Sequence, residues 1–211
     1  MQEPAYLNSN ASIIKFYMII PIPKFSTHRL ILKGVTETDV KFITKYFVDY
    51  EVIRHLAHAV PWPYPENGVE EYIQNVVLPN QGKGRWTWGI YLKESPNEII
   101  GSVDLWIEGT PENRGFWLAR KYWNQGIMTE AMYPIIDFAF DDVGFEKLIF
   151  ANALGNIRSR KVKEKTGCKL IDVTPCKFVD PGFTEQEIWE LSKEDWVQHK
   201  LTCDEMYDRE K

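Results

Sequence analysis

A possible anion site lies where a short apolar run gives way to a polar loop and then to an apolar helical pattern, between Leu118 and Ala131. Phe116, Trp117 and Leu118 are typical of a buried strand. Gly126 can bring its backbone close to a ligand. The N–H groups at a helix start lack partners inside the helix and, with the helix dipole, favour an anion. The junction predicts a phosphate-binding turn, with a strand-to-helix turn that binds nothing as the alternative.

Two further sets of polar residues have types suited to chemistry. Asp104 is a carboxylate inside a predicted strand, where it faces either a cleft or water. Asn156 is a good N-cap for a short helix from Ile157 to Lys165. That helix is strongly basic, which predicts either a solvated face or a contact with a phosphorylated ligand. Its cations are Arg158, Arg160, Lys161, Lys163 and Lys165.

The cysteines and histidines do not indicate a metal site. Cys168, Cys176 and Cys203 are odd in number and lack the close paired spacing of zinc ligands, so they are interpreted as reduced thiols in a cytoplasmic protein. His55 and His58 are three residues apart, but no third ligand is near them in the sequence. We therefore expect no metal.

The composition predicts a globular protein. With 211 residues, 44% of them hydrophobic, the chain can bury a full core in one domain. The net charge of −5 makes a broad basic face for nucleic acid unexpected. The apolar run from Ile13 to Ile20 is too short to span a bilayer, so no membrane contact is expected. We expect an N-terminal extension over 1–23, one domain over 24–198 and a tail over 199–211.

The hydrophobic periodicity predicts the elements that position these residues. A capping box at Thr36–Asp39 starts the first helix. Pro134 predicts a kink or a late start in the long helix after Gly126. Ser95–Asn97 is expected to be a turn. Strands are predicted at 29–32, 86–92, 99–108, 115–119, 147–151, 170–173 and 187–191, and helices at 36–50, 69–77, 127–143 and 157–165.

The segment Pro61–Pro65 must be a stiff aromatic loop, because each proline removes a donor and restricts the residue before it. Trp62 and Tyr64 either line a substrate pocket or pack against the body of the domain.

The element order and three motifs resemble the GNAT superfamily of acetyl-CoA-dependent N-acetyltransferases, and most closely its ribosomal-protein (RimJ/RimL-like) branch. The resemblance covers roughly residues 25 to 197. The motifs are Gly115–Ala119, Tyr122–Ala131, and Asn156–Ser159 followed by Glu164–Gly167. The resemblance implies an α/β (α+β) fold: a mixed central sheet of about six to seven strands with about four helices, splayed at the cofactor strand.

The resemblance also implies an acetyl-CoA site. The pyrophosphate loop falls on Trp123 to Met128, with Gly126 as its matching glycine; Trp123 and Met128 replace a polar and a small residue of the pattern. The backbone of the splayed strand would pair with the pantetheine arm. The implied cofactor-binding residues are Trp117, Leu118, Ala119, Arg120, Asn124, Gln125, Gly126, Ile127, Met128, Thr129, Asn156 and Ser159.

Acetyl transfer needs a neutral amine, a donor for the oxyanion and an acid for the leaving thiolate. A backbone N–H near Leu118 is the candidate donor. Ser159 is the candidate acid, because the tyrosine that many members place four residues later is Lys163 here; a local hydrogen bond of Ser159 is the alternative. Asp104 and Glu112 are candidate bases, and the reaction without a side-chain base stays open.

The leading hypothesis is an N-acetyltransferase that moves an acetyl group from acetyl-CoA to a protein N-terminus or a small amine by direct attack, as a monomer or homodimer. A non-catalytic acyl-CoA-binding or sensing module is the alternative, favoured by the departures at Trp123, Met128 and Asn113. The third hypothesis is an ordinary α/β domain whose resemblance to the GNAT superfamily is accidental.

Overall fold

The computed structural model describes residues 19–107 and 112–209, and the side chains of 203–209 are left out of the description. Most of the predicted N-terminal extension, and the end of the strand predicted over 99–108, lie outside the described residues. Within them, no helix is long and apolar enough to cross a membrane.

The first half of the chain builds an antiparallel five-stranded sheet, with the strands in sequence order. The turn expected at Ser95–Asn97 was wrong: Ser95 already pairs with Leu92, so Lys93 and Glu94 form the turn. The strands are β1 (Phe25–Ser26), β2 (Leu30–Gly34), β3 (Arg85–Leu92), β4 (Ser95–Trp106) and β5 (Arg114–Leu118).

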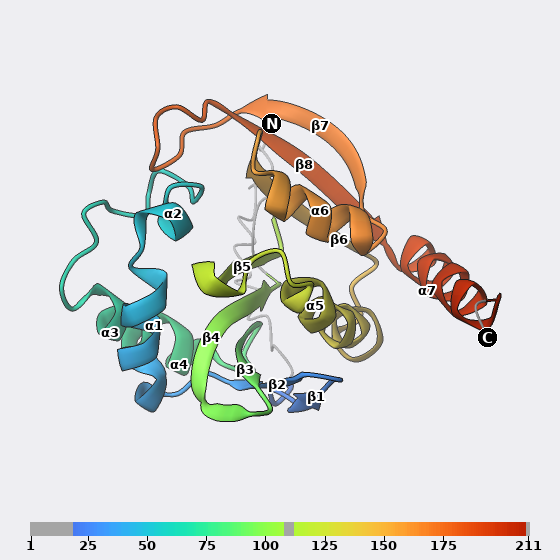
Figure 1. The fold of residues 1–211 in the computed structure, drawn as a ribbon, viewed down its shortest axis with the longest axis horizontal. Coiled ribbons are helices and arrows are strands. Elements are labelled where there is room, and N and C mark those ends of the chain that lie inside the picture. Colours follow the sequence, from blue (N-terminus) through green and yellow to red (C-terminus); the bar gives the residue numbers. More distant parts are fainter. Residues whose placement is uncertain (1–18, 108–111, 210–211) are drawn as a thin grey trace, which may run out of the picture.

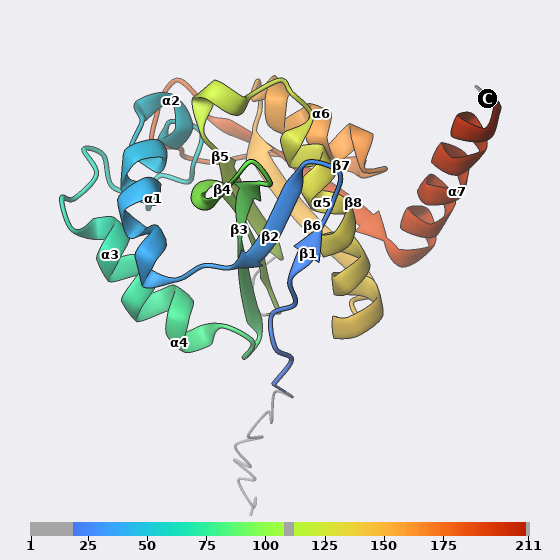
Figure 2. The same ribbon diagram turned by 60° about the horizontal axis from the view of Figure 1, so that its bottom comes forward.

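Short helices between β2 and β3 cover one face of this sheet (Figures 1 and 2). The capping box at Thr36 is confirmed. The second predicted helix is longer than expected, because it continues through a π-helical turn and over Pro79 to Asn80. The elements are η1 (Glu37–Asp39), α1 (Val40–Phe47), α2 (Tyr50–Ile53), α3 (Gly68–Tyr72), η2 (Ile73–Val77) and α4 (Leu78–Asn80).

The opposite face is covered by α5 (Ile127–Phe138), whose apolar side joins the main core. Pro134 lies inside this helix, and the regular ladder widens into the π-helical turn η4 (Ala139–Val143) directly after Phe138. Gly144 ends the helix in a left-handed conformation, with φ of 84°.

The second half of the chain forms a three-stranded antiparallel sheet in the order β6 (Lys147–Ala153), β8 (Glu185–Ser192), β7 (Lys169–Pro175). The last two strands of the chain, β7 and β8, pair antiparallel. α6 (Ile157–Lys165) connects β6 to β7, and α7 (Lys193–Arg209) extends away from the body of the molecule (Figure 1).

The two sheets meet where β5 and β6 begin and then separate. The Asn113 N–H donates to the Ile149 carbonyl at 3.0 Å, and the Ile149 N–H donates to Asn113 Oδ1 at 3.2 Å. No ladder joins these strands beyond that point in the described chain. The α/β fold and the splay are confirmed, but the splay divides the strands into two antiparallel sheets instead of one mixed sheet.

Candidate active site

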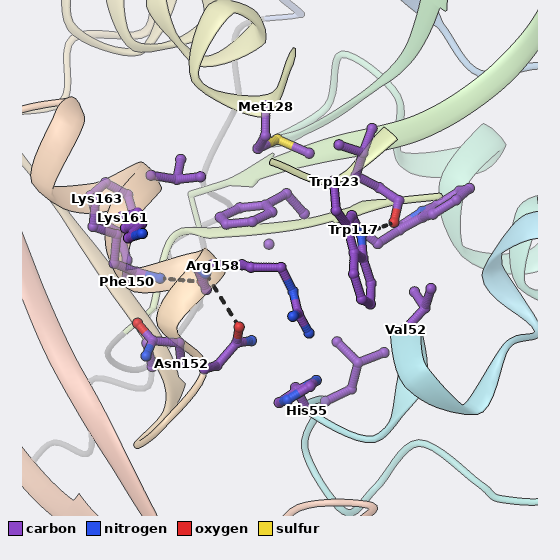
Figure 3. A pocket seen from close by; sticks show the side chains of 18 of the residues that line it. Val52, His55, Trp117, Trp123, Met128, Phe150, Asn152, Arg158, Lys161 and Lys163 are labelled. Carbon is purple, nitrogen blue, oxygen red and sulfur yellow. Dashed lines mark hydrogen bonds between the residues drawn. The ribbon is translucent and has the colours of Figure 1, made fainter. Parts of the chain in front are cut away.

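A cavity of about 430 Å³ lies where β5 and β6 diverge. Its walls come from α2, β5, the loop before α5, β6, α6 and the end of β7 (Figure 3). Among the described hydrogen bonds, only the two between Asn113 and Ile149 connect the two sheets at the point where β5 and β6 begin to separate. The gap therefore offers free strand edges to a ligand.

The loop between η3 (Arg120–Tyr122) and α5 is shaped for an anion. Asn124 and Gly126 both have left-handed backbones, with φ of 60° and 73°. The first hydrogen bond of the helix runs from the Glu130 N–H to the Gly126 carbonyl at 3.0 Å. The N–H groups of the three residues between them thus have no acceptor within the helix, and they lie at its positive end. These residues are Ile127, Met128 and Thr129, and all three line the cavity.

Residues far away in the sequence fix this helix start. Arg29 Nε donates to Glu130 Oε2 at 2.7 Å, and its Nη1 donates to the Gln125 carbonyl at 2.9 Å. The Thr27 hydroxyl donates to the same carboxylate at 2.6 Å. The turn before β2 therefore holds the anion loop in place, which the local sequence did not reveal.

Trp123, where the family pattern has a polar residue, is also anchored. Its indole Nε1 donates to the Leu118 carbonyl at 2.7 Å. The guanidinium of Arg158 lies 3.9 Å from its ring centroid, a cation–π contact that ties α6 to the loop (Figure 3). The departure at Trp123 thus rigidifies the loop.

The backbone N–H and C=O groups of successive β5 residues point alternately toward β4 and toward the gap. The Trp106 N–H donates to the Asn113 carbonyl, and the Ala119 N–H donates to the Ile100 carbonyl at 2.8 Å. Odd-numbered residues of β5 therefore bond to β4, and the groups of Phe116 and Leu118 face the gap. The backbone groups of Trp117 and Ala119, which were predicted to pair with the pantetheine arm, face β4 instead of the gap.

The first turns of α6 bring a hydroxyl and an amine together. Asn156 Oδ1 accepts from the Ser159 N–H at 3.2 Å, as the predicted cap requires. Lys163 Nζ donates to Ser159 Oγ at 2.9 Å, and both side chains are buried. Burial, and then the charge of Arg114, lower the pKa of Lys163 to about 7. The lysine amine can therefore give up or take a proton near neutral pH.

Two more polar side chains of the cavity, Asn152 and Glu112, have groups that a ligand could use. Asn152 donates to the Ala153 carbonyl and to Glu187, which leaves its Oδ1 without a hydrogen bond although it is buried. Burial raises the pKa of Glu112, and the charge of Lys163 opposes this shift. An acceptor and a carboxyl group are thus available to a ligand.

The structure brings most predicted residues together. Ser159, Glu112, Trp117, Leu118, Asn156 and the run from Asn124 to Thr129 line the cavity. Ala119 and Arg120 are absent from the lining. Trp62 is 42% exposed and packs on Tyr50, and Tyr64 packs on Phe47, so neither lines the cavity.

Asp104 lies outside the cavity lining and is paired instead. Arg85 Nη2 donates to Asp104 Oδ2 and to the Tyr72 hydroxyl. Tyr72 donates to the same carboxylate oxygen at 3.4 Å. Burial and the charge of Asp104 raise the pKa of Tyr72 to about 12, so the phenol stays a donor.

Sequence reasoning missed the buried polar residues Lys163, Asn152 and Arg114, which all line the cavity. The helical period from Ser159 to Lys163 was the available signal, since residues four apart lie on one helix face. Among the described residues, no three His, Cys, Asp or Glu side chains gather as a metal site.

A family model described as an acetyltransferase (GNAT) domain matches residues 29–169. The chain belongs to the GNAT acetyltransferase family. A curated relative, the FsC-acetyl coenzyme A-N(2)-transacetylase of Aspergillus fumigatus, is 25% identical over 190 residues, which cover 83% of this chain and 79% of that protein.

Solved structures share the fold. Mycobacterium smegmatis RimJ in complex with CoA-disulfide superposes with a TM-score of 0.71 at 14% identity, over 86% of this chain and 94% of that one. A RimL ribosomal L7/L12 alpha-N-protein acetyltransferase in complex with coenzyme A gives a TM-score of 0.67 at 17% identity, over 81% of this chain and 97% of that one.

This GNAT protein is therefore an acyltransferase enzyme, and acetyl-CoA is the donor that its family uses. The residues present fit that molecule. The free N–H groups at the start of α5 suit its phosphates. The open edge of β5 and the orphaned Asn152 oxygen suit the amides of its pantetheine arm.

Proposed function

We propose that this GNAT enzyme transfers an acetyl group from acetyl-CoA to a primary amine by direct attack. The observation that carries the proposal is the Ser159–Lys163 pair, a hydroxyl and a titratable amine 2.9 Å apart. The pair lines the cavity that β5 also lines. A proton donor and backbone donors thus lie in one cleft, which is what acetyl transfer to nitrogen needs.

The anion loop and β5 would hold the donor molecule. The N–H groups of Ile127, Met128 and Thr129 would bind its pyrophosphate, and the gap-facing groups of Phe116 would pair with its pantetheine arm. Because Trp123 already occupies the Leu118 carbonyl, that arm would have one acceptor fewer on β5. When bound, acetyl-CoA supplies the activated acyl carbon.

The Ser159–Lys163 pair would deliver the proton that the departing thiolate needs. Ser159 would donate its hydroxyl proton and recover one from the ammonium of Lys163. The Leu118 N–H, fixed in the strand and facing the gap, would stabilise the charge that develops on the thioester oxygen. This arrangement needs no reorganisation of the protein during the reaction.

Glu112 is the candidate base for the acceptor amine. It lines the cavity, and burial raises the pKa of its carboxyl group toward the range useful for proton transfer. The acceptor would enter past α2 and the end of β7, where Val52, His55 and Phe178 form the wall. The names of the relatives, an N(2)-transacetylase and an alpha-N-protein acetyltransferase, support nitrogen acceptors of both small-molecule and protein kinds.

Cys168 is poorly suited to carry an acyl group. Burial raises the pKa of the Cys168 thiol, which makes it a poor nucleophile. Cys176 lies on the wall at the end of β7. We expect the variants Cys168→Ala and Cys176→Ala to keep turnover, and loss of turnover with retained acetyl-CoA binding in either variant would contradict direct attack.

Calorimetry with acetyl-CoA, followed by a thiol-release assay over a panel of amines, tests the proposal. We expect binding and amine-dependent release of the CoA thiol. Tight binding without release for any amine would favour a sensing module instead, and absence of binding would exclude both functions.

A further inference from the structure

Arg114, on β5, is a buried cation that forms no ion pair with any described residue. The side chain is 4% exposed. Its Nε, Nη1 and Nη2 atoms are buried, and none has a hydrogen-bond partner among the described residues. Its guanidinium instead lies 3.9 Å from the ring centroid of Phe150 and 5.9 Å from that of Phe116. Five N–H donors are thus enclosed without an acceptor.

The charges around Arg114 increase this imbalance. Lys163 is 1% exposed, and its positive charge and that of Arg114 lie close enough to lower the pKa of the lysine. The Cys168 thiol is the other group that interacts with the arginine, and burial keeps this thiol neutral by raising its pKa. The charges of Glu187 and Glu112 act on Lys163, but no carboxylate is among the groups that shift the pKa of Arg114. Of these two buried cations, the proposed acetyl transfer uses only the lysine.

Four other arginines of the described chain are paired. Arg29, Arg54, Arg85 and Arg160 each form an ion pair with a carboxylate. All four are more exposed than Arg114, so the residue that most needs a counter-charge has none. A buried unpaired charge is costly, which makes this arrangement unfavourable unless a bound molecule supplies the anion.

A group bound in the cavity can reach this pair. Arg114, Lys163, Phe116 and Phe150 all line it, so the cations lie in the wall that a bound molecule contacts. The anion loop at the start of α5 is a separate part of the lining, so the phosphates of the donor have their own site. Arg114 and Lys163 are therefore free to bind a different, smaller anion. The planar guanidinium group of Arg114 matches the geometry of a carboxylate.

We propose that Arg114, with Lys163 beside it, binds a carboxylate that a substrate carries into the cleft. This inference rests on the proposed acetyl transfer and adds a substrate class to it. The carboxylate belongs either to the acyl group of a dicarboxylic acyl-CoA, used in addition to acetyl-CoA, or to an acceptor amine that is also an acid. Both sources present the same chemistry to the arginine.

Calorimetry on matched ligand pairs separates the two sources. The donor arm compares succinyl-CoA with butyryl-CoA, which has a chain of the same length without the charge. The acceptor arm compares glutamate with its α-carboxamide and with glutamine, in the presence of CoA. We expect about a 10- to 100-fold preference for the carboxylate in one arm, as a charge-assisted bidentate contact provides.

The variant Arg114→Met should lose that preference, and Arg85→Met, which removes a paired arginine outside the cavity lining, should keep it. A ratio below about 3 in both arms of the wild-type protein would overturn the proposal, and this measurement does not depend on how the variant folds. A preference that survives in folded Arg114→Met would overturn it as well.

The thiol-release assay tests acetyl transfer independently of the carboxylate preference. A carboxylate preference without thiol release from any amine would refute the proposed reaction and keep the carboxylate site. Thiol release without a preference would refute the site and keep the reaction. Failure of every acyl-CoA to bind would refute both.

Discussion

Arg85 and Arg114 lie on strands of the same sheet, yet their surroundings are opposite. Arg85 joins Asp104 and Tyr72 in a hydrogen-bonded cluster, in which the buried atoms Arg85 Nε and Asp104 Oδ1 lack a partner among the described residues. Arg114 lies in the cleft with no acceptor among the described residues, next to a buried lysine. The first cluster supplies its own counter-charge, and the second does not.

The difference separates stabilising polar residues from residues that await a ligand. A charge that is paired inside the protein has little left to offer a substrate. The free N–H groups before α5, the Asn152 oxygen and the Arg114 guanidinium all lie around one cavity and share the property of being unsatisfied. Buried atoms without partners also occur elsewhere in the described chain, as at Thr87 and Arg85, so it is the position of these groups around one cavity that marks the site.

The largest effect on acetyl-CoA binding is expected from closing the anion loop. Gly126→Val should weaken acetyl-CoA binding by roughly 100-fold or more, because a branched side chain is strained at a φ of 73° and crowds the free N–H groups. Gly144→Val is the matched control: its φ is 84°, and a side chain there meets nothing within 4 Å. Calorimetry should show loss of binding only in the first variant, and equal affinities would contradict the site.

The next effect tests the Ser159–Lys163 pair. Lys163→Met and Ser159→Ala should each lower kcat by roughly 10²- to 10⁴-fold, the usual contribution of proton transfer by a side chain. Lys169→Met, an exposed lysine paired with Asp195, should change kcat little. A thiol-release assay at saturating acetyl-CoA measures this. Activity near that of the wild type in both variants would remove the pair from the mechanism.

Lys163 also predicts how stability depends on pH. Its pKa is about 7 in the folded protein and about 10.4 in the unfolded chain. Between these values the unfolded chain binds more protons, so the free energy of unfolding should rise with pH by up to about 1.4 kcal/mol per pH unit from this group. Below pH 7 Lys163 is protonated in both the folded and the unfolded chain. The free energy of unfolding is then lowered by the full cost of burying its ammonium group.

Urea unfolding of the wild type and Lys163→Met across this range isolates that contribution, since other groups cancel in the difference. The advantage of the variant should be greatest at low pH and shrink as pH rises. A difference between the two proteins that does not change with pH would mean that the lysine titrates normally.

Local signals in the sequence predicted part of this site, and tertiary packing decided the rest. Gly126 and Asn156 were found because a left-handed turn and a helix cap depend on neighbouring residues. Lys163 lies in a basic run that resembles a solvated helix face, and only packing of α6 over the cleft buries it. Arg114 begins a strand, and nothing adjacent in sequence shows that its counter-charge is missing.

Asp104 is the converse case. Its place in a strand next to the cofactor strand made it a candidate base, but pairing depends on Arg85, which is 19 positions earlier in the chain. Such contacts follow from strand register and the packing of α3, which the sequence pattern did not define. The backbone orientation of Trp117 and Ala119 was likewise a matter of register with β4.

Replacing the two arginines should change the free energy of unfolding in opposite directions. Arg114→Met should raise the free energy of unfolding by about 1–4 kcal/mol, because an apolar side chain replaces an uncompensated buried charge. Arg85→Met should lower it by about 1–3 kcal/mol, because Asp104 would keep a half-buried carboxylate without its partner. Chemical denaturation measures both, and destabilisation of the same size in both variants would mean that Arg114 is paired in solution.

The smallest effect is expected at Asp104. Asp104→Asn should leave kcat/KM within about threefold of the wild type, since this carboxylate is held by Arg85 outside the cavity lining. Glu112→Gln, within the lining, should reduce it more. Steady-state kinetics with the best amine compares them, and a larger loss at Asp104 would restore it as the base.

A crystal structure with CoA bound tests the central claim most directly. We predict the pyrophosphate on the N–H groups of Ile127, Met128 and Thr129, the pantetheine arm along Phe116 and Leu118, and the sulfur beside Ser159. CoA bound against the Asp104–Arg85–Tyr72 cluster, or elsewhere outside the gap between β5 and β6, would contradict the account.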